Sequence, residues 1–343
     1  MGAGIGPRTA QHRRNDVAKH AQVRRKQPET TSSTIARIFR NDESSLGAEI
    51  ADTVARREKL SHTSISRPAR TRFLAVANQK GGVGKTTTMV NLAAAYAHAG
   101  LRVLAIDMDP QGNASTALGI RHAEDIPSVY DVLEGRLTME DVRHPCPEFP
   151  NLDVIPSSLS LAGAEMELVE VPDRTLLLKQ ALKRTLTTGE QRYDYVIIDC
   201  PPSLGLLSLN ALCAVTGVLV PLQAEYYSLE GLSQLMRAIT MVQEHYNPEL
   251  QVIGLLITMF DRRTRLSKEV FDRVKEGYPE ATLETTIPRS VRIAEAPSHL
   301  QTVLTYDPQG MGSVAYREAA LEISQRISGS DLDANEESET RSS

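Results

Sequence analysis

One short segment has the composition of a phosphate-binding loop. Residues 79–88 are QKGGVGKTTT. The run from Gly84 to Thr86 matches the end of the pattern G-x-x-x-x-G-K-[ST], in which backbone N–H groups and a helix N-terminus hold phosphate oxygens. The first glycine of that pattern is replaced by Gln79, and a second lysine, Lys80, follows it. The segment predicts a P-loop of a variant type, with a chance glycine-rich turn as the alternative.

The roles within this loop follow from its chemistry. Lys85 should reach the β and γ phosphates, and the hydroxyl of Thr86 should bind Mg²⁺. Glycines let the backbone approach the phosphates and adopt angles that a Cβ forbids. We expect Thr87 to hold the α-phosphate, and we predict ATP and Mg²⁺ as cofactors. The expected nucleotide-binding residues of the loop are Gly81, Gly82, Val83, Gly84, Lys85, Thr86 and Thr87, whereas Lys80, taken alone, could equally be a surface residue.

Acidic residues follow two apolar runs and could complete a metal site. Asp199 ends the run YVIID, and a P-loop needs an acid at the end of a neighbouring strand to hold the Mg²⁺ shell. Asp107 and Asp109 lie two residues apart after another apolar run, so both side chains fall on the same side of an extended stretch. Either of these two could instead cap the turn before Pro110.

Alternating strand and helix patterns should position these residues. Strands are predicted at 73–78, 102–107, 152–156, 195–199, 217–222, 251–258 and 283–288. Helical periodicity is clearest at 228–244 and appears again at 313–327. Short apolar runs that alternate with helices are typical of βαβ units. The predicted fold class is α/β: a mostly parallel, twisted sheet with helices on both faces, of the P-loop NTPase type.

The composition is that of an ordinary globular protein. Of the 343 residues, 41% are apolar, 24% are charged and 4% are aromatic, and Trp is absent, which predicts a core of Val, Leu, Ile and Ala. The three cysteines, Cys146, Cys200 and Cys213, lack a metal-like spacing, and the N-terminus does not resemble a signal peptide. No apolar run approaches the roughly 18 to 20 residues that cross a bilayer. We therefore expect a cytoplasmic protein without a stable membrane anchor.

Charge divides the chain unevenly. Residues 1–70 contain 14 Lys and Arg against 7 Asp and Glu, a net charge of +7 in a chain of −5, which leaves −12 on the remainder. Few large apolar side chains occur there, so a basic, largely disordered extension is predicted. Residues 35–39 and 46–54 could become helical on a partner, or the extension is a solvated linker. Residues 71–328 form the predicted ATPase domain, and residues 329–343 a flexible acidic tail.

Together these segments resemble the ParA/MinD group of deviant Walker-type ATPases. The likeness covers roughly residues 72–327 and includes the motifs QKGGVGKTTT, DPQGN, DCPPSLG, EYYSLEG, TMFDRRT, IPRSVR and AEAPSH. In that group the extra lysine, here Lys80, reaches across a dimer to the nucleotide of the partner subunit. A cation supplied in trans can stabilise charge on the transferred phosphoryl group, as an arginine finger does. The resemblance therefore implies an ATP-induced homodimer.

The same resemblance implies roles for residues around the loop. Asp109 would orient the attacking water, and Asp107 would make switch contacts near the metal. The DPQGN segment resembles a switch that senses the γ-phosphate. Pro288 and Arg289 belong to a segment that resembles the loop lining the adenine, which adds them to the nucleotide-binding set. The expected catalytic residues are then Lys80, Lys85 and Asp109, and the expected metal-associated residues are Thr86, Asp199 and Asp107.

Features outside the loop select one branch of the group. MinD-like members end in a basic amphipathic helix that lies on the membrane, whereas this chain ends in acids. The nitrogenase iron-protein branch needs cysteines that bridge a cluster across the dimer, and Cys200 lacks a suitably placed second cysteine. The tyrosine-kinase relatives carry a tyrosine-rich tail, and the tail here has none. The chain is most similar to the chromosome and plasmid partition ATPases of the ParA branch.

Two arginine clusters interrupt the acidic domain. Arg262, Arg263 and Arg265 lie in one loop, and Arg289 and Arg292 lie in another. Partition ATPases bind double-stranded DNA without sequence preference when the ATP dimer forms, which requires Lys or Arg facing phosphates. By the resemblance, Arg263 and Arg292 match the DNA-contacting arginines. Relatives usually have a non-basic residue and Asn at positions 262 and 265. Arg262 and Arg265 are therefore extra charges, which makes them additional DNA-binding candidates. Solvated arginines on exposed loops are the alternative.

The resemblance implies a slow ATPase that dimerises on ATP, associates with the nucleoid and is stimulated by a ParB-type centromere-binding partner. The basic extension could add DNA affinity, dock a polar scaffold protein or be inert. Two other classes of function remain open: a membrane-positioning ATPase of the MinD kind, and a carrier that positions another large cargo on the nucleoid. The sequence does not distinguish chromosomal from plasmid origin, and it does not identify the partner.

Overall fold

The computed structural model describes residues 1, 45–123, 126–188, 192–226 and 228–341. Backbone contacts divide the chain into two units, residues 1–58 and 59–343. Helix α2 (Ser45–Ser61) begins in the first unit. It contains the helical pattern that we predicted at residues 46–54, whereas the pattern at 35–39 lies outside the described residues. The boundary of the basic extension at residue 70 stays a prediction.

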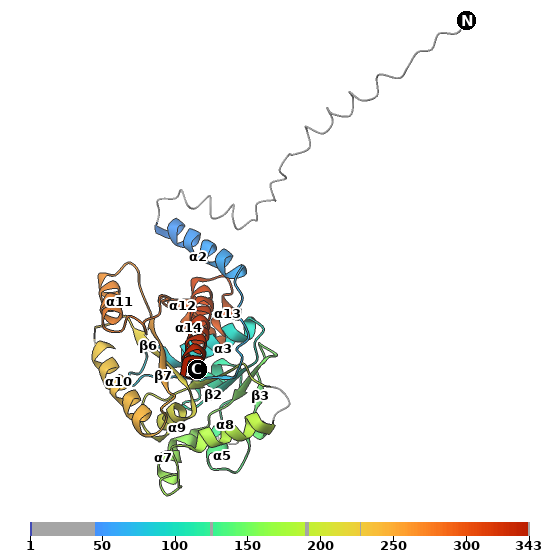
Figure 1. Ribbon diagram of the computed structural model, residues 1–343, viewed down its shortest axis with the longest axis vertical. Coiled ribbons are helices and arrows are strands. Elements are labelled where there is room, and N and C mark those ends of the chain that lie inside the picture. The colour runs from blue at the N-terminus through green and yellow to red at the C-terminus, as the bar shows by residue number, and fades with distance from the viewer. Residues whose placement is uncertain (2–44, 124–125, 189–191, 227, 342–343) are drawn as a thin grey trace. The chain divides into compact units, whose positions relative to one another are not determined.

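The second unit is built on a seven-stranded sheet, which lies at its centre in Figure 1. The strand order is β3-β4-β2-β5-β1-β6-β7, and all pairs are parallel except β3 with β4. This arrangement confirms the predicted α/β class with a mostly parallel sheet. The strands are β1 (Arg72–Val76), β2 (Val103–Asp107), β3 (His144–Pro145), β4 (Leu152–Ile155), β5 (Tyr195–Asp199), β6 (Gly217–Gln223) and β7 (Gln251–Thr258).

Both faces of the sheet are buried, which explains why the strands are almost continuously apolar. Successive side chains of a strand point to opposite faces. In β2, Leu104 and Ile106 join one buried cluster, and Val103 and Ala105 join the other. Each cluster needs its own covering layer of helices.

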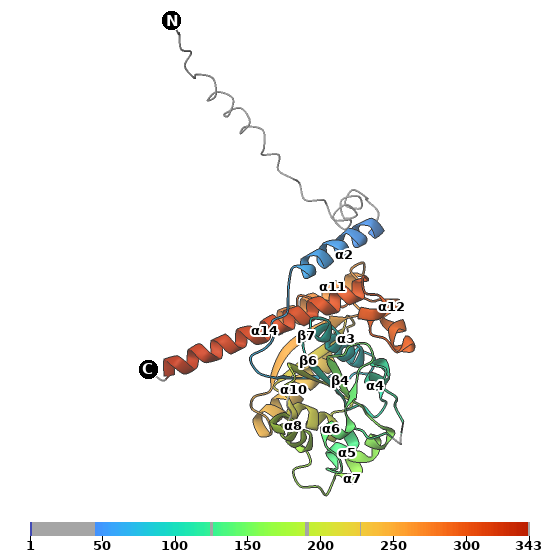
Figure 2. The same ribbon diagram turned by 90° about the vertical axis from the view of Figure 1, so that its right-hand side faces the viewer.

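Helices cover the two faces in two sets, which Figure 2 shows on either side of the strands. None of the described helices is long and apolar enough to cross a membrane. On the first face lie α3 (Lys85–His98), α4 (Asn113–Ala117), α12 (Val291–Glu295), η2 (Ala296–His299), α13 (Val303–Tyr306) and α14 (Met311–Arg341). On the second lie α5 (Val129–Leu133), α6 (Met139–Val142), η1 (Leu159–Gly163), α7 (Ala164–Glu167), α8 (Leu177–Thr188), α9 (Leu206–Ala214), α10 (Ser228–His245) and α11 (Arg265–Gly277).

The strand predicted at 283–288 is not formed, and that prediction was wrong. The segment runs beside β7 but forms no continuous ladder with it: isolated bridges join Thr282 to Leu255 and Pro288 to Phe260, which lies just beyond β7. Between these points the N–H groups of Glu284 and Thr285 donate to the carboxylate of Glu322 on α14, at 2.8 and 2.9 Å. The ladder is interrupted because a side chain takes the hydrogen bonds that a neighbouring strand would otherwise accept.

The last helix is longer than predicted. The periodicity indicated a helix over 313–327, and α14 continues to Arg341. Beyond Gly329 the sequence contains Ala, Leu and Glu, which favour helix, and no proline that would break it. The backbone of residues 330–341 is therefore helical where we expected an irregular tail, and the flexibility of residues 329–343 stays a prediction.

Candidate functional site

The candidate site lies at the carboxyl edge of the central strands. Strand β1 leads into the loop before α3, and its neighbours are β5 and β6. Asp199 ends β5 opposite Val76 of β1 and opposite Asp107 of β2. In open α/β sheets, ligands bind beyond the carboxyl ends of the strands, where helices on the two faces diverge. The topology thus gathers the predicted loop and two of the predicted acids at one point.

The backbone of the loop has the conformation of a phosphate cradle. Gly82 and Gly84 have φ angles of 76° and 87°, which strongly favour glycine. A Cβ added at Gly81 or Gly82 would meet nothing within 4 Å, so the space beside these two Cα atoms is open. The hydroxyl of Thr258, at the end of β7, donates to the carbonyl of Val83 at 2.8 Å and fixes the far side of the loop.

Lys85 is the buried lysine of this loop. It is only 6% exposed, and its Nζ donates to the carbonyl oxygen of Lys80 at 3.2 Å. Burial lowers the pKa of Lys85, and the charges of Asp199 and Asp109 oppose that shift. Lys85 opens α3, followed by Thr86 and Thr87, so the first turn of the helix and its N-terminal dipole point toward the same space. This is an anion site with a desolvated cation at its floor.

Thr86 and Asp199, which we predicted to associate with the metal, are in contact. The hydroxyl of Thr86 donates to Oδ2 of Asp199 at 2.7 Å, and the other carboxylate oxygen is buried without a hydrogen-bond partner among the described residues. Burial, and then the nearby charge of Asp107, raise the pKa of Asp199 well above its ordinary value. A cation would satisfy the orphaned oxygen. One carboxylate and one hydroxyl suit Mg²⁺, which keeps its waters and phosphate ligands.

No group of three or more His, Cys, Asp and Glu side chains forms a metal cluster in the described part of the chain. At a nucleotide site, phosphates and water supply most of the ligands of Mg²⁺. Thr86 and Asp199 therefore fit Mg²⁺ held together with a nucleotide. In that position the cation would neutralise charge on the phosphate oxygens.

Asp107 and Asp109 organise the DPQGN segment. Oδ2 of the fully buried Asp107 accepts from the backbone N–H and the hydroxyl of Ser115, each at 2.7 Å, and Oδ1 accepts the N–H of Asp109 at 3.1 Å. Burial raises the pKa of Asp107 to about 6, although the bonds from Ser115 act in the opposite direction. Asp109 accepts the N–H of Gln111 at 3.0 Å, which is the turn cap weighed as an alternative.

These contacts bear on the predicted roles of both acids. Both oxygens of Asp107 are engaged within the chain, so it orders the segment after β2, and its part at the metal stays a prediction. The carboxylate of Asp109 is close enough to Lys85 and Asp199 to influence their pKa values. Asp109 can therefore cap the turn and also lie near the reacting phosphate, so its two predicted roles are compatible.

The second lysine of the loop has a different environment. The Nζ of Lys80 forms an ion pair with Glu225 at 3.1 Å, and the two side chains are 35% and 43% exposed. The backbone N–H of Lys80 donates to Oδ1 of Asn78 at 3.0 Å, and Asn78 in turn donates to the carbonyl of Pro221 at 2.7 Å. The backbone before the loop is thus fixed to β6, while the side chain of Lys80 lies at the surface.

The predicted adenine loop lies next to the end of β7. Ile287 donates to the carbonyl of Ile257 at 2.8 Å, and Arg289 donates to that of Phe260 at 3.2 Å. Pro288 forms an isolated bridge with Phe260. Because Thr258 of the same strand supports the P-loop, residues 287–289 lie on the carboxyl edge that also carries the phosphate cradle.

The two arginine clusters lie on neighbouring segments at this edge, called the arginine loops here, although Arg265 is the first residue of α11 and Arg292 belongs to α12. Arg263 is 77% exposed, and its guanidinium forms two bonds with Asp261, at 3.0 and 3.1 Å. Arg265 is 92% exposed and pairs with Glu269 at 2.8 Å. Arg262 lies beside them in the loop before α11. The bond between Arg289 and Phe260 joins this loop to the second cluster.

In the second cluster, Arg292 is 61% exposed. Its Nη1 lies 3.5 Å from Glu295 and 3.4 Å from the hydroxyl of Tyr306, whose ring centroid is 5.7 Å from the guanidinium carbon. The bond to Tyr306 raises the pKa of Arg292, so the side chain is cationic at any ordinary pH. Arg263, Arg265 and Arg292 are thus each paired with a nearby carboxylate on an exposed surface.

Four residues that support this site were missed by the sequence analysis. Each is a polar residue at the end of a strand or in the segment after it, and two of them, Glu225 and Thr258, also begin the motifs EYYSLEG and TMFDRRT. Asn78 had been placed inside a strand, although β1 ends two residues earlier. The four are Asn78, Ser115, Glu225 and Thr258.

Comparison with known proteins decides the family. A family model described as an AAA domain matches residues 71–252. The Soj sporulation initiation inhibitor of Bacillus subtilis is 48% identical over 252 residues, which cover 74% of this chain and 98% of the relative. The chromosome partitioning protein ParA of Caulobacter vibrioides is 48% identical over 255 residues, covering 74% and 94%. The chain belongs to the Soj/ParA family. It is a P-loop ATPase with ATP and Mg²⁺ as cofactors.

Solved structures agree with this assignment. A Mycobacterium smegmatis protein described as a cobyrinic acid a,c-diamide synthase, with ADP and magnesium bound, is 40% identical with a TM-score of 0.63 and covers 73% of this chain and 92% of its own. The septum site-determining protein MinD of Pyrococcus horikoshii, complexed with Mg-ADP, is 23% identical with a TM-score of 0.57 and covers 75% and 96%. At that identity the likeness to MinD supports the fold alone.

Proposed function

We propose that the chain is a partition ATPase that dimerises on ATP, binds double-stranded DNA without sequence preference and leaves the DNA when a ParB-type centromere-binding partner stimulates slow hydrolysis. Its working location is then the nucleoid in the cytoplasm. The chromosome-partitioning relatives at 48% identity support the biological process. DNA binds the dimer better than the monomer, so hydrolysis that dissolves the dimer lowers the affinity for DNA.

The observation that carries this proposal is the contrast between two lysines five positions apart. Lys85 is buried at the floor of the loop, whereas Lys80 is 35% exposed and held at the surface by Glu225. A buried lysine serves the nucleotide of its own subunit. An exposed lysine beside the cradle can exchange its carboxylate for a phosphate oxygen of a second subunit, where it acts as a cation supplied in trans.

The arginine loops support the DNA-binding half of the proposal. Arg263 and Arg292 are largely exposed and lie on adjacent loops of an otherwise acidic body. Phosphate binding would replace their pairs with Asp261 and Glu295, which are exposed pairs that cost little to break. Arg262 and Arg265 add charge to the same surface, and binding should therefore weaken as salt rises.

The basic extension, residues 1–70, is assigned to docking of a polar scaffold protein. Its net charge of +7 also suits phosphates. Deletion of these residues separates the two uses. Loss of polar localisation with an unchanged salt dependence of DNA binding supports docking, whereas a shallower salt dependence assigns the segment to DNA.

Fluorescence anisotropy with a labelled duplex, together with light scattering to measure mass, tests the main proposal. With ATP and Mg²⁺, the unmodified protein should dimerise and bind duplexes of unrelated sequence equally well. Lys80→Ala and Lys85→Ala should both fail to form the DNA-bound dimer, Lys85→Ala because it binds the triphosphate poorly. ATP-dependent DNA binding that persists in both variants would contradict the proposal.

A further inference from the structure

The segment before the adenine loop is positioned by α14 as well as by β7. Residues 282–288 run alongside β7, with a bridge from Thr282 to Leu255 of β7 at one end and a bridge from Pro288 to Phe260, just beyond β7, at the other. Leu283 donates to the carbonyl of Leu255 at 3.0 Å, and Ile287 donates to that of Ile257 at 2.8 Å. Between these bonds the segment lacks a ladder to β7, and its backbone turns toward the last helix.

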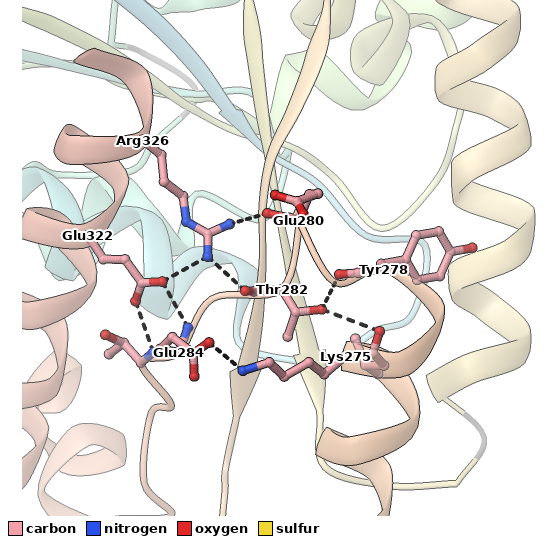
Figure 3. A network of polar contacts seen from close by, with 9 residues as sticks. Lys275, Tyr278, Glu280, Thr282, Glu284, Glu322 and Arg326 are labelled. Atoms are coloured by element: carbon pink, nitrogen blue, oxygen red, sulfur yellow. Dashed lines mark hydrogen bonds and ion pairs between the residues drawn. The ribbon is translucent and has the colours of Figure 1, made fainter. Parts of the chain in front are cut away.

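Two side chains of α14 form hydrogen bonds with the backbone of this segment, as Figure 3 shows. The carboxylate of Glu322 accepts two successive N–H groups, those of Glu284 at 2.8 Å and Thr285 at 2.9 Å. Arg326 donates to the carbonyls of Glu280 at 2.6 Å and Thr282 at 2.8 Å, and to Glu322 at 3.0 Å. One ion pair therefore clamps both donors and acceptors of a single segment.

The ion pair of Glu322 and Arg326, called the clamp below, is largely buried, which strengthens its hydrogen bonds. The side chains of Glu322 and Arg326 are 18% and 28% exposed, in contrast to the nearby pair of Lys275 and Glu284, which are 40% and 69% exposed. Hydrogen bonds from backbone N–H groups to a carboxylate are charge-assisted, and bonds of that kind are about twice as strong as neutral ones. The outer pair joins side chains only, so it leaves the backbone of the segment unconstrained.

The clamp lies only three residues from the adenine loop. From Thr285 to Pro288 an extended chain spans about 10 Å, so the clamp and the bond of Ile287 to Ile257 together set the position of the loop. The same helix packs on α3, the helix that follows the P-loop, and Ala315 and Ala319 of α14 belong to the buried cluster that contains residues of α3. Helix α14 thus touches both the phosphate side and the base side of the site.

We propose that Glu322 and Arg326 are positioning residues for base recognition: α14 holds residues 284 and 285 so that Pro288 and Arg289 meet the adenine. This inference rests on the proposed assignment of those two residues to the base. Neither clamp residue belongs to the P-loop or to the two residues assigned to the base. Loss of the clamp therefore weakens the contribution of the base to binding and leaves that of the phosphates intact.

The test compares ATP with inorganic tripolyphosphate, which has the phosphates but no base, each titrated calorimetrically in the presence of Mg²⁺ into the full-length protein. Glu322→Gln keeps the shape of the side chain but replaces one acceptor with a donor that faces an N–H group. It should weaken ATP binding about five- to tenfold, the usual worth of one or two hydrogen bonds, and leave tripolyphosphate binding unchanged. Arg326→Lys should give a smaller loss of the same kind.

Glu284→Gln is the matched control, because it removes the outer ion pair on the same segment and should change neither affinity. Circular dichroism checks that each variant is folded. Equal weakening of the binding of both ligands by Glu322→Gln, or of neither, overturns the proposal.

Arg289→Ala shows which part of the proposal is wrong if the test fails. If Arg289→Ala lowers ATP affinity selectively and Glu322→Gln does not, only the clamp is wrong. If Arg289→Ala also leaves ATP affinity unchanged, the assignment of Pro288 and Arg289 to the base is wrong, and so is the proposed role of the clamp.

Discussion

The nucleotide loop and the arginine loops lie on the same edge of the sheet but are built in opposite ways. Around the nucleotide loop, Lys85, Asp107 and Asp199 are at most 6% exposed, and burial shifts the pKa of each. On the arginine loops, Arg263 and Arg292 are 77% and 61% exposed and pair with carboxylates at the surface.

The difference separates a preorganised chemical site from an adaptable surface. Buried charges in a low-dielectric environment interact strongly with one another and with a ligand, and they need no reorganisation when it arrives. Exposed ion pairs are screened and contribute little to stability, so they can be exchanged for other anions at small cost. Substitutions in the two regions should therefore differ in size, in salt dependence and in pH dependence.

The largest effect is expected from Lys85→Ala. Removing a buried cation from the phosphate site should lower the kcat for ATP hydrolysis at least about 100-fold, the usual loss when one such donor is removed. A coupled phosphate-release assay measures the rate. Lys275→Ala removes an exposed lysine from α11 and serves as the control. A Lys85 variant within tenfold of the unmodified protein would place the chemistry elsewhere.

The buried acids should produce a pH-dependent stability in the absence of nucleotide and Mg²⁺. Burial raises the pKa of Asp107 from 3.8 to about 6, so the folded protein binds this proton more tightly than the unfolded chain does. Its contribution to the free energy of unfolding is complete below pH 3.8 and is lost as the pH rises through about 6.

Urea unfolding of the unmodified protein and of Asp107→Asn measures that contribution as a difference between the two. The difference should decline by roughly 1 to 3 kcal/mol as the pH rises from about 4 to 7, since one pKa unit corresponds to about 1.4 kcal/mol. The other ionisable groups are common to both proteins and cancel, except Asp199, whose pKa is raised by the charge of Asp107 and which therefore adds to the decline. A difference that stays constant or grows with pH would show that Asp107 does not titrate in this way.

On the adaptable side, Arg263→Ala and Arg292→Ala should each weaken ATP-dependent DNA binding several-fold and reduce the slope of log K against log salt by about 1. Arg143→Ala is the matched control, because that arginine is also exposed and ion-paired but precedes β3, at the opposite edge of the sheet from β7. Equal slopes for the three variants would remove the arginine loops from the DNA-binding surface.

The smallest effect is expected from Glu225→Gln. The pair with Lys80 is 43% and 35% exposed, so its loss is worth less than about 1 kcal/mol, or up to about fivefold in an equilibrium. Because this substitution frees Lys80, ATP-dependent dimerisation should occur at a lower protein concentration in light scattering. Glu249→Gln, on an exposed loop, should leave it unchanged. A higher concentration for Glu225→Gln would mean that the pair supports the dimer.

Local patterns in the sequence were enough to predict the sheet and the centre of the site. Six of the seven predicted strands are present, because each is a buried apolar run of the kind that parallel sheets require. Contacts between residues distant in the chain were not predictable. The segment at 283–288 has the alternation of a strand, but Glu322 nearly 40 residues later takes its N–H groups. Glu225 likewise becomes a partner of Lys80 only through the order of the strands.

The central claim is that Lys80 completes the ATP site of a second subunit, and mixing two inactive variants tests it most directly. Lys80→Ala retains its own phosphate cradle but lacks the lysine supplied in trans, and Lys85→Ala retains Lys80 but binds ATP poorly. In a mixed dimer, the cradle of the first variant receives Lys80 from the second. ATP hydrolysis, measured with DNA present, should therefore be restored to a substantial fraction of the unmodified rate on mixing. A mixture no more active than the separate variants would contradict the claim.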